Sequence, residues 1–162
     1  IGVLEDECNE LNRRIFTFHQ KQRPFIILKW AESADGFIAP EKRAEQKPVW
    51  ITNPYSRQLV HKWRSEEHAI LVGTQTVIDD NPALTVRDWT GNNPIRIILD
   101  RQDRIPKESH IFNNEAETII ISQKNNASGH PNVVFETIDF KENSTAEIIG
   151  ILYKHNIQSG II

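Results

Sequence analysis

The residues best suited to chemistry lie between Trp50 and Arg87, in a stretch rich in groups that handle phosphates and nucleotides. It contains Arg64 and Arg87, and a planar guanidinium binds a phosphate monoester through two parallel, charge-assisted hydrogen bonds. Asp80 lies between the two arginines, among small hydroxylated residues, a second acid and a proline-fixed turn. A surface salt bridge is the alternative role for such arginines.

Lys29 is a further candidate because it closes the continuous apolar run 25–28, which is typical of a buried strand. A lysine in this place is either directed at a ligand or simply exposed. The Asp35-Gly36 pair that follows predicts a turn, with an apolar stretch resuming at 37–39. Residues 40–48 are polar, and we interpret them as a loop over a site or as a solvated connection.

A helix of about three turns is predicted to begin at Asn53-Pro54, because asparagine caps free backbone N–H groups and proline fits the first helical position. Its apolar face would consist of Leu59, Val60 and Trp63. The polar side chains that would then point elsewhere are Arg57, His61 and Arg64.

Short apolar runs predict the strands of an α/β sheet with helices on both faces. The runs are 25–28, 69–72, 95–100, 118–122, 133–135 and a last one that starts at 159. We expect residues 73–87 to form a loop at the carboxyl edge of the sheet, where open α/β folds bind ligands. An amphipathic helix is predicted in residues 1–20 from the spacing of Leu4, Cys8, Leu11 and Ile15, and a capping box at Ser144 predicts another.

Composition limits the possible classes of protein. The chain has 162 residues, which suits one domain, and its net charge of −3 with scattered basic residues gives no reason to expect nucleic acid or a membrane as partner. It has one cysteine, so we expect a reducing cytoplasm. It begins with Ile and contains no Met, so we expect a piece of a longer product.

Several familiar sites are missing from the sequence. No Gly-x-Gly-x-x-Gly occurs, which disfavours a Rossmann domain, and no Ser/His/Asp constellation suggests a hydrolase. The six histidines show no metal-ligand spacing.

Several motifs in order resemble the reductase domain of the bifunctional riboflavin-biosynthesis deaminase/reductase. They are 29–36 (KWAESADG), 50–52 (WIT), 68–73 (HAILVG), and Thr76-Val77 with 81–87 (NPALTVR), and the resemblance covers roughly residues 8 to 105. It implies a three-layer α/β/α, dihydrofolate-reductase-like fold, with 1–22 as a connecting helix and 23–162 as a reductase domain truncated at its C-terminus. The zinc signature of the deaminase half is absent, so no zinc is expected in this chain.

The resemblance implies reduction of 5-amino-6-(5-phosphoribosylamino)uracil to its ribitylamino product by NADPH, in a cytoplasmic homodimer. A phosphorylated pyrimidine would be the partner, with no nucleic acid or membrane. The family's pyrophosphate loop follows the strand that begins near Ile161, where this sequence ends, so we expect that segment in a continuation or an incomplete cofactor site.

Matching the family motif residue by residue implies roles for ten positions. Lys29 and Asp80 would act at the reacting centre. The substrate would be bound by Pro48, Arg64, Leu84 and Arg87, and the cofactor by Ala31, Trp50, Thr76, Asp80 and Arg101.

At three of these positions, either another role is possible or the residue differs from the one common in the family. Ordinary core packing is the alternative for Trp50. Pro48 and Arg101 stand where the family often has serine. Proline cannot donate a side-chain hydrogen bond, whereas Arg101 could pair with a 2′-phosphate and so favour NADPH.

Two other functions remain open at this point. A dihydrofolate-type pterin reductase would need a buried acid and no phosphate-directed arginines. A non-catalytic nucleotide-binding module is suggested by the missing glycine loop.

Overall fold

The computed structural model describes residues 2–42, 45–124 and 129–162. Within these ranges a single sheet of parallel strands has the order β1-β6-β2-β3-β4-β5. The strands are β1 (Phe25–Ile27), β2 (Ala69–Gly73), β3 (Ile95–Leu99), β4 (Thr118–Ser122), β5 (Val133–Thr137) and β6 (Ser159–Ile161). The helices are α1 (Glu5–Leu11), α2 (Arg13–Lys21), α3 (Pro54–Glu66), α4 (Thr74–Asp80) and α5 (Ser144–Lys154), with a 3-10 turn η1 (His110–Phe112).

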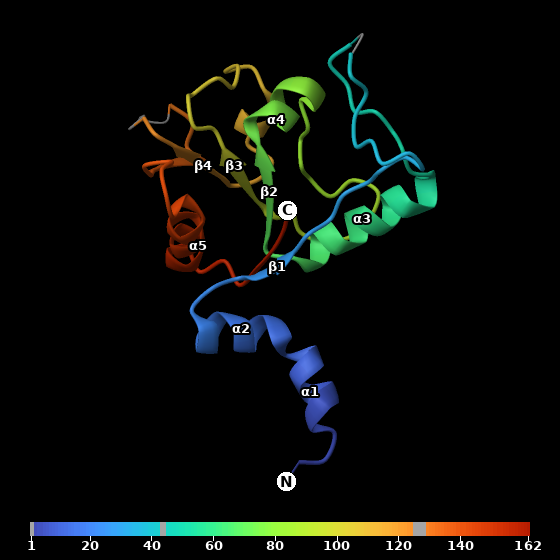
Figure 1. Cartoon of the computed structure of the whole chain (residues 1–162), viewed down its shortest axis with the longest axis vertical. Coiled ribbons are helices and arrows are strands. Elements are labelled where there is room, and N and C mark those ends of the chain that lie inside the picture. The colour runs from blue at the N-terminus through green and yellow to red at the C-terminus, as the bar shows by residue number, and fades with distance from the viewer. Residues whose placement is uncertain (1, 43–44, 125–128) are drawn as a thin grey trace.

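Alternate residues of the central strands pack on opposite faces of the sheet, as the two-residue period of a strand requires. Ile98 of β3 joins a core that includes Val77 of α4, while its neighbour Ile97 joins a second core with Leu152 of α5. Figure 1 shows α4 and α5 on different sides of the strands. The predicted α/β fold with helices on both faces is therefore confirmed. The predicted loops at 40–48 and 123–131 include positions 43–44 and 125–128, which lie outside the described residues.

The last strand in the sequence, β6, lies between β1 and β2. Pairing with β1 continues past the strand ends, because the Lys29 amide donates to the Ile162 carbonyl (2.8 Å) and the Ile162 amide donates to the Ile27 carbonyl (2.9 Å). The backbone of Lys29 is thus held at the carboxyl edge of the sheet. Leu28, predicted as the end of the first strand, is instead exposed beyond it.

The predicted loop 73–87 begins with a short helix, α4, so the prediction was wrong for Thr74–Asp80, whereas residues 81–87 form a loop as predicted. The Thr74 hydroxyl donates to the Leu99 carbonyl (2.8 Å) and lies 3.0 Å from an Asp100 carboxylate oxygen. Val77, one turn later, is fully buried. Asn81 ends the helix in the left-handed conformation that asparagine tolerates. Tertiary contacts therefore stabilise a helix too short for sequence periodicity to indicate.

The N-terminal region forms two helices where one was predicted. Asn12 has a non-helical backbone, and its side chain donates to the Cys8 carbonyl (2.8 Å). The expected apolar stripe is also exposed, since Leu11 keeps 80% of its side-chain surface and Ile15 47%. Figure 1 shows α1 extending away from the sheet.

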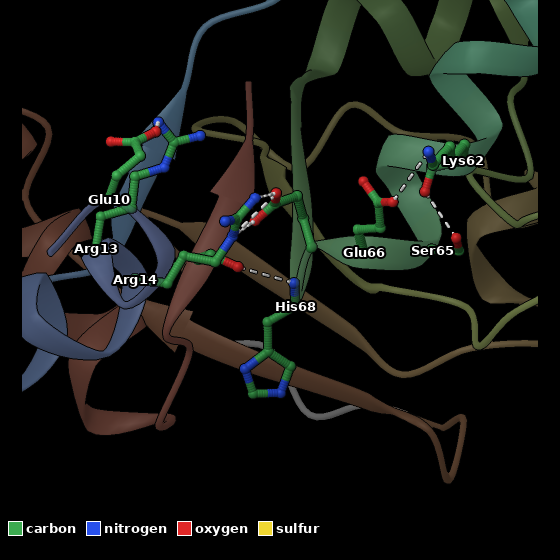
Figure 2. Close-up of polar contacts among 9 residues, drawn as sticks. Glu10, Arg13, Arg14, Lys62, Ser65, Glu66 and His68 are labelled. Carbon is green, nitrogen blue, oxygen red and sulfur yellow. Dashed lines mark hydrogen bonds and ion pairs between the residues drawn. The ribbon is translucent and has the colours of Figure 1, made fainter. Parts of the chain in front are cut away.

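An ion pair between Arg14 and Glu67 fastens α2 to the start of β2. Arg14 Nε donates to Glu67 Oε2 (2.9 Å), its Nη2 bonds Glu67 Oε1, and the Glu67 side chain is buried. Figure 2 shows Arg14 beside His68 in this region. The hydrogen bonds from Arg14 and Ser159 hold the pKa of Glu67 below its ordinary value even though burial raises it.

The capping box predicted at Ser144 is absent from the start of α5. Ser144 is the first helical residue, the preceding Asn143 has a left-handed backbone (φ 74°), and no side chain caps the helix. The predicted apolar face is present, with Leu152 buried in the second core and Ile148 packed against it.

We expect Asp100→Asn to destabilise the fold by about 2 kcal/mol. The buried Asp100 carboxylate accepts from the Arg104 amide and the Ile105 amide (both 3.1 Å) besides meeting Thr74, and an amide NH₂ would oppose one of these donors. Urea unfolding measures the change. The matched control is Asp103→Asn, at an exposed left-handed position that asparagine tolerates, with an expected change within about 0.5 kcal/mol. Equal effects of the two substitutions would contradict this account.

Candidate functional site

The helix α3 begins as predicted but faces the other way. The Asn53 side chain accepts from the Ser56 amide (2.9 Å) and Pro54 occupies the first turn, which confirms the predicted start. Of the predicted apolar face, Leu59 (43% accessible) and Trp63 (39%) are exposed and Val60 is partly buried. His61 is the buried residue of the helix, at 2%. The polar side of α3 therefore packs inward.

Arg64 lies on this inward side and holds the loop that follows α4. Its Nη1 donates to the Thr85 carbonyl (2.7 Å), while its Nε is buried without a partner among the described residues. Burial, and then the charge of Arg87, lower the pKa of Arg64 to about 10. The surface salt bridge that was the alternative for Arg64 is therefore wrong.

His61, one turn before Arg64, holds the main chain of Arg87. The Arg87 amide donates to His61 Nδ1 (3.1 Å). On the other side of the ring, Nε2 lies 3.7 Å from Asp88 Oδ2. The pKa of His61 is lowered by burial and by the charges of Arg64, Arg87 and Arg57, while Asp88 opposes the shift.

Lys29 belongs to the same cluster of cations. Its pKa is lowered, first by burial and then by the charge of Arg64. Lys29 therefore lies within electrostatic reach of Arg64, and Arg64 lies within electrostatic reach of Arg87. Such a group of like charges at the edge of a sheet favours an anion between them.

The turn between α4 and Arg87 is built on a constrained residue. Leu84 has a left-handed backbone (φ 55°), which is uncommon for a residue other than glycine or asparagine. Its side chain is 5% exposed and packs in the first core with Val77. A ligand contact at Leu84 is thus left to its main chain, which turns the buried Thr85 toward Arg64.

The remaining predicted residues come from several other elements of the fold. Trp50 is 54% exposed and the Arg57 guanidinium lies 4.6 Å from its ring centroid, so core packing as an alternative for Trp50 is wrong. Arg101, after β3, is exposed and donates to Gln123 (3.0 Å). Asp80 is in the last turn of α4, partly buried. Of the others, Ala31 is partly buried, and Pro48 and Thr76 are exposed.

Two cavities have polar walls. One, of about 520 Å³, is lined by Gln58, Arg87, Asp88, Trp89 and Thr90, so it borders the cation cluster. The other, of about 410 Å³, lies near the amino ends of β2 and β6, and Figure 2 shows Ser65, Glu66 and His68 beside it. Its buried charge, Glu67, is already paired with Arg14, so we assign the site to the cavity beside Arg87.

The described ranges contain neither a cluster of metal-ligating side chains nor a membrane-spanning helix. No group of three or more His, Cys, Asp or Glu side chains there could hold a metal ion. None of the helices there is long and apolar enough to span a bilayer.

Two contributors to the site were missed in the sequence, namely His61 and the carbonyl of Thr85. His61 lies four residues after Arg57 and three before Arg64, so all three share one helical face. That spacing was visible, but the apolar residues were expected to face inward. The Thr85 carbonyl has no signal in the sequence, because any residue carries such a group.

Comparison with known proteins identifies the family of the chain. Residues 24–159 match the family model described as the RibD C-terminal domain. The chain belongs to this family. Over 128 residues, 78% of this chain, it is 44% identical to the riboflavin biosynthesis protein RibD of Aquifex aeolicus, and it is 32% identical to RibD of Synechocystis over 96% of its length.

A solved RibD-family structure has the same fold over almost the whole chain. It is a diaminohydroxyphosphoribosylaminopyrimidine deaminase/5-amino-6-(5-phosphoribosylamino)uracil reductase from Thermotoga maritima, with a TM-score of 0.87 and 37% identity over 99% of this chain. This chain covers 44% of that protein and 35% of the Aquifex aeolicus RibD, so it spans less than half of these RibD proteins.

Protonation of His61 predicts a specific pH dependence of stability in this RibD-family domain. Its folded pKa lies below the ordinary value of 6.5, so below that pH the unfolded chain takes up a proton that the folded chain excludes. Stability is therefore complete above about pH 6.5 and falls as the pH drops below it, by at most about 1.4 kcal/mol per pH unit.

Urea unfolding from about pH 7 to pH 5 measures this slope. The control is His61→Asn, which does not titrate. The contribution of Glu67, whose pKa is also lowered, is lost only at lower pH and is common to both proteins. Identical slopes for the two proteins would show that His61 is not excluded from protonation.

Proposed function

We propose that this chain reduces 5-amino-6-(5-phosphoribosylamino)uracil to 5-amino-6-(5-phosphoribitylamino)uracil with NADPH, in riboflavin biosynthesis. Membership of the RibD C-terminal domain family supports this proposal, as does the similarity to the Thermotoga maritima protein, whose name includes that reductase. The single structural observation that carries it is that α3 holds Arg64 and the main chain of Arg87 close together, through Thr85 and His61, with Lys29 in electrostatic reach of Arg64.

In this proposal Arg64 and Arg87 bind the phosphate of the substrate. Two guanidinium groups near one another repel, and a phosphate between them converts that repulsion into charge-assisted hydrogen bonds. The Nε of Arg64, which is buried without a partner among the described residues, is a further donor beside this pair. The cavity bordered by Arg87 and Trp89 offers space beside them. Leu84 contributes through its main chain, and the exposed Pro48 contributes only a van der Waals contact.

Lys29 and Asp80 act at the sugar. The ribosyl ring opens to an imine as the bond from the sugar C1′ to the ring oxygen breaks, and C1′ then accepts a hydride. A proton must reach the ring oxygen or the imine nitrogen, and Lys29 supplies it or polarises that atom. Its lowered pKa suits this role, because an ammonium with a lower pKa gives up its proton more readily. Asp80 orients Lys29 in this scheme.

The residues matched to the cofactor fit a dinucleotide phosphate. Trp50 offers an exposed aromatic face, Thr76 an exposed hydroxyl on α4, and Arg101 an exposed guanidinium for a 2′-phosphate. Ala31 follows Lys29 by two residues and would lie beside the nicotinamide. NADPH supplies the hydride when bound.

We also propose that the protein acts as a cytoplasmic homodimer. The single cysteine of the chain supports a reducing compartment. The exposed Tyr55, Leu59 and Trp63 of α3 support a dimer because they form an apolar surface that a second copy would cover.

Substrate comparison tests the proposed function. We expect NADPH oxidation with 5-amino-6-(5-phosphoribosylamino)uracil, and a kcat/KM at least about 100-fold lower with the dephosphorylated compound, because Arg64 and Arg87 would then have no phosphate to bind. Dihydrofolate should not be reduced. Reduction of dihydrofolate would favour a pterin reductase, and no oxidation with any substrate would favour a non-catalytic nucleotide-binding module.

Lys29→Ala should lower kcat by about 100-fold or more, the usual size of a general-acid contribution, with a smaller change in KM. Steady-state kinetics at saturating NADPH measure both constants. The control is Lys107→Ala, at an exposed position in the loop after β3, which should leave both unchanged. An unchanged kcat for Lys29→Ala would exclude Lys29 from the reaction.

A further inference from the structure

Three consecutive main-chain groups in the loop before β3 are each held by a side chain. The Thr85 carbonyl accepts from Arg64 (2.7 Å), the Val86 amide donates to Asn93 Oδ1 (2.8 Å), and the Arg87 amide donates to His61 Nδ1 (3.1 Å). Two of the three side chains come from one turn of α3. The position of Arg87 relative to Arg64 is therefore set by side chains of a helix and not by sheet pairing.

The hydrogen bond from the Arg87 amide defines the tautomer and the charge of the His61 ring. A main-chain N–H can only donate, so His61 Nδ1 must carry a lone pair and the ring proton must be on Nε2. The ring is then neutral, with Nε2–H turned toward Asp88. A neutral ring suits this place, because Arg57, Arg64 and Arg87 all lie near enough to lower its pKa.

We propose that His61 is a positioning residue: its neutral imidazole holds the Arg87 main chain so that the Arg87 and Arg64 guanidinium groups bind one phosphate together. His61 is 2% exposed, so its ring does not itself contact ligand from solvent and acts through the Arg87 backbone. The inference rests on the proposed function, in which these two arginines bind the substrate phosphate.

The choice between positioning and simple packing depends on one acceptor atom. A residue that only fills space could be replaced by another of similar size. A positioning residue must keep an acceptor at the place of Nδ1. Asparagine puts its amide oxygen close to that place, whereas glutamine reaches the place of Nε2 and leucine has no acceptor.

Binding of ribose 5-phosphate to the full chain, measured by isothermal titration calorimetry, tests the inference without requiring turnover. We expect His61→Leu and His61→Gln to raise the Kd about tenfold, the effect of leaving one buried amide unpaired. His61→Asn should restore it to within about twofold. The same pattern should appear in KM for the proposed substrate, with kcat changed by less than about twofold. Arg87→Ala is the positive control for lost phosphate binding.

His68→Leu is the matched control. His68 Nδ1 also accepts a main-chain amide, that of Gln158 (3.3 Å), but near the amino ends of β2 and β6. Its loss should leave the Kd for ribose 5-phosphate unchanged. Thermal unfolding of every variant shows that the binding data come from folded protein, and if His61→Leu does not fold, the contrast between His61→Asn and His61→Gln decides.

Each result has one consequence. Equal binding by His61→Asn and His61→Gln, or wild-type binding by His61→Leu, overturns the inference. Failure of the unmodified chain to bind ribose 5-phosphate overturns it as well, because there would be no phosphate site to position. The expected pattern of binding without NADPH oxidation would support the role of His61 and contradict the proposed reduction.

Discussion

The insertion of β6 between β1 and β2 is the constraint on which the rest of the arrangement depends. Parallel pairing on both sides of β6 places the carboxyl ends of β1, β6 and β2 side by side. The pairing extends to the amide of Lys29 through the Ile162 carbonyl. Residues more than 130 positions apart in the chain therefore fix the start of the segment that carries Lys29. Without β6, β1 would have no partner among the described strands.

Two arginines of the structure, Arg96 and Arg64, show what separates a structural guanidinium from one directed at a ligand. Arg96 of β3 is fully buried and donates to the carbonyls of His110 and Ile111 and to Asn113, so it joins the sheet to η1. Arg64 donates to one carbonyl and lies close to two other cations. The first arrangement uses most of the donors of the guanidinium. The second leaves donors and positive charge for an anion, and it costs stability until one binds.

The orientation of α3 follows from the same electrostatics. An amphipathic helix on a soluble domain normally buries its apolar stripe. In α3 the residues on the inward side are Arg57, His61 and Arg64, which meet Asp88, Arg87 and Thr85 of the neighbouring loop, while Leu59 and Trp63 remain exposed. Polar contacts to a loop thus take the place of apolar packing. This is a common compromise where a helix serves a binding site and its other face is free for a further contact.

The sequence by itself determined the strands, because short runs rich in isoleucine, such as Ile95–Leu99 and Thr118–Ser122, are typical of buried strands in an α/β fold. It also determined the start of α3 at Asn53-Pro54, where the cap is local chemistry. The resemblance to the family implied roles for Lys29, Arg64 and Arg87 from the sequence alone. The tertiary structure alone decided which face of α3 turns inward, that residues after Gly73 form a helix, and that His61 accepts from Arg87. These features depend on contacts between segments that are distant in the chain. Hydrophobic periodicity reflects the preference of one segment only, and it contains no information about the charges and carbonyl groups that neighbouring segments will present.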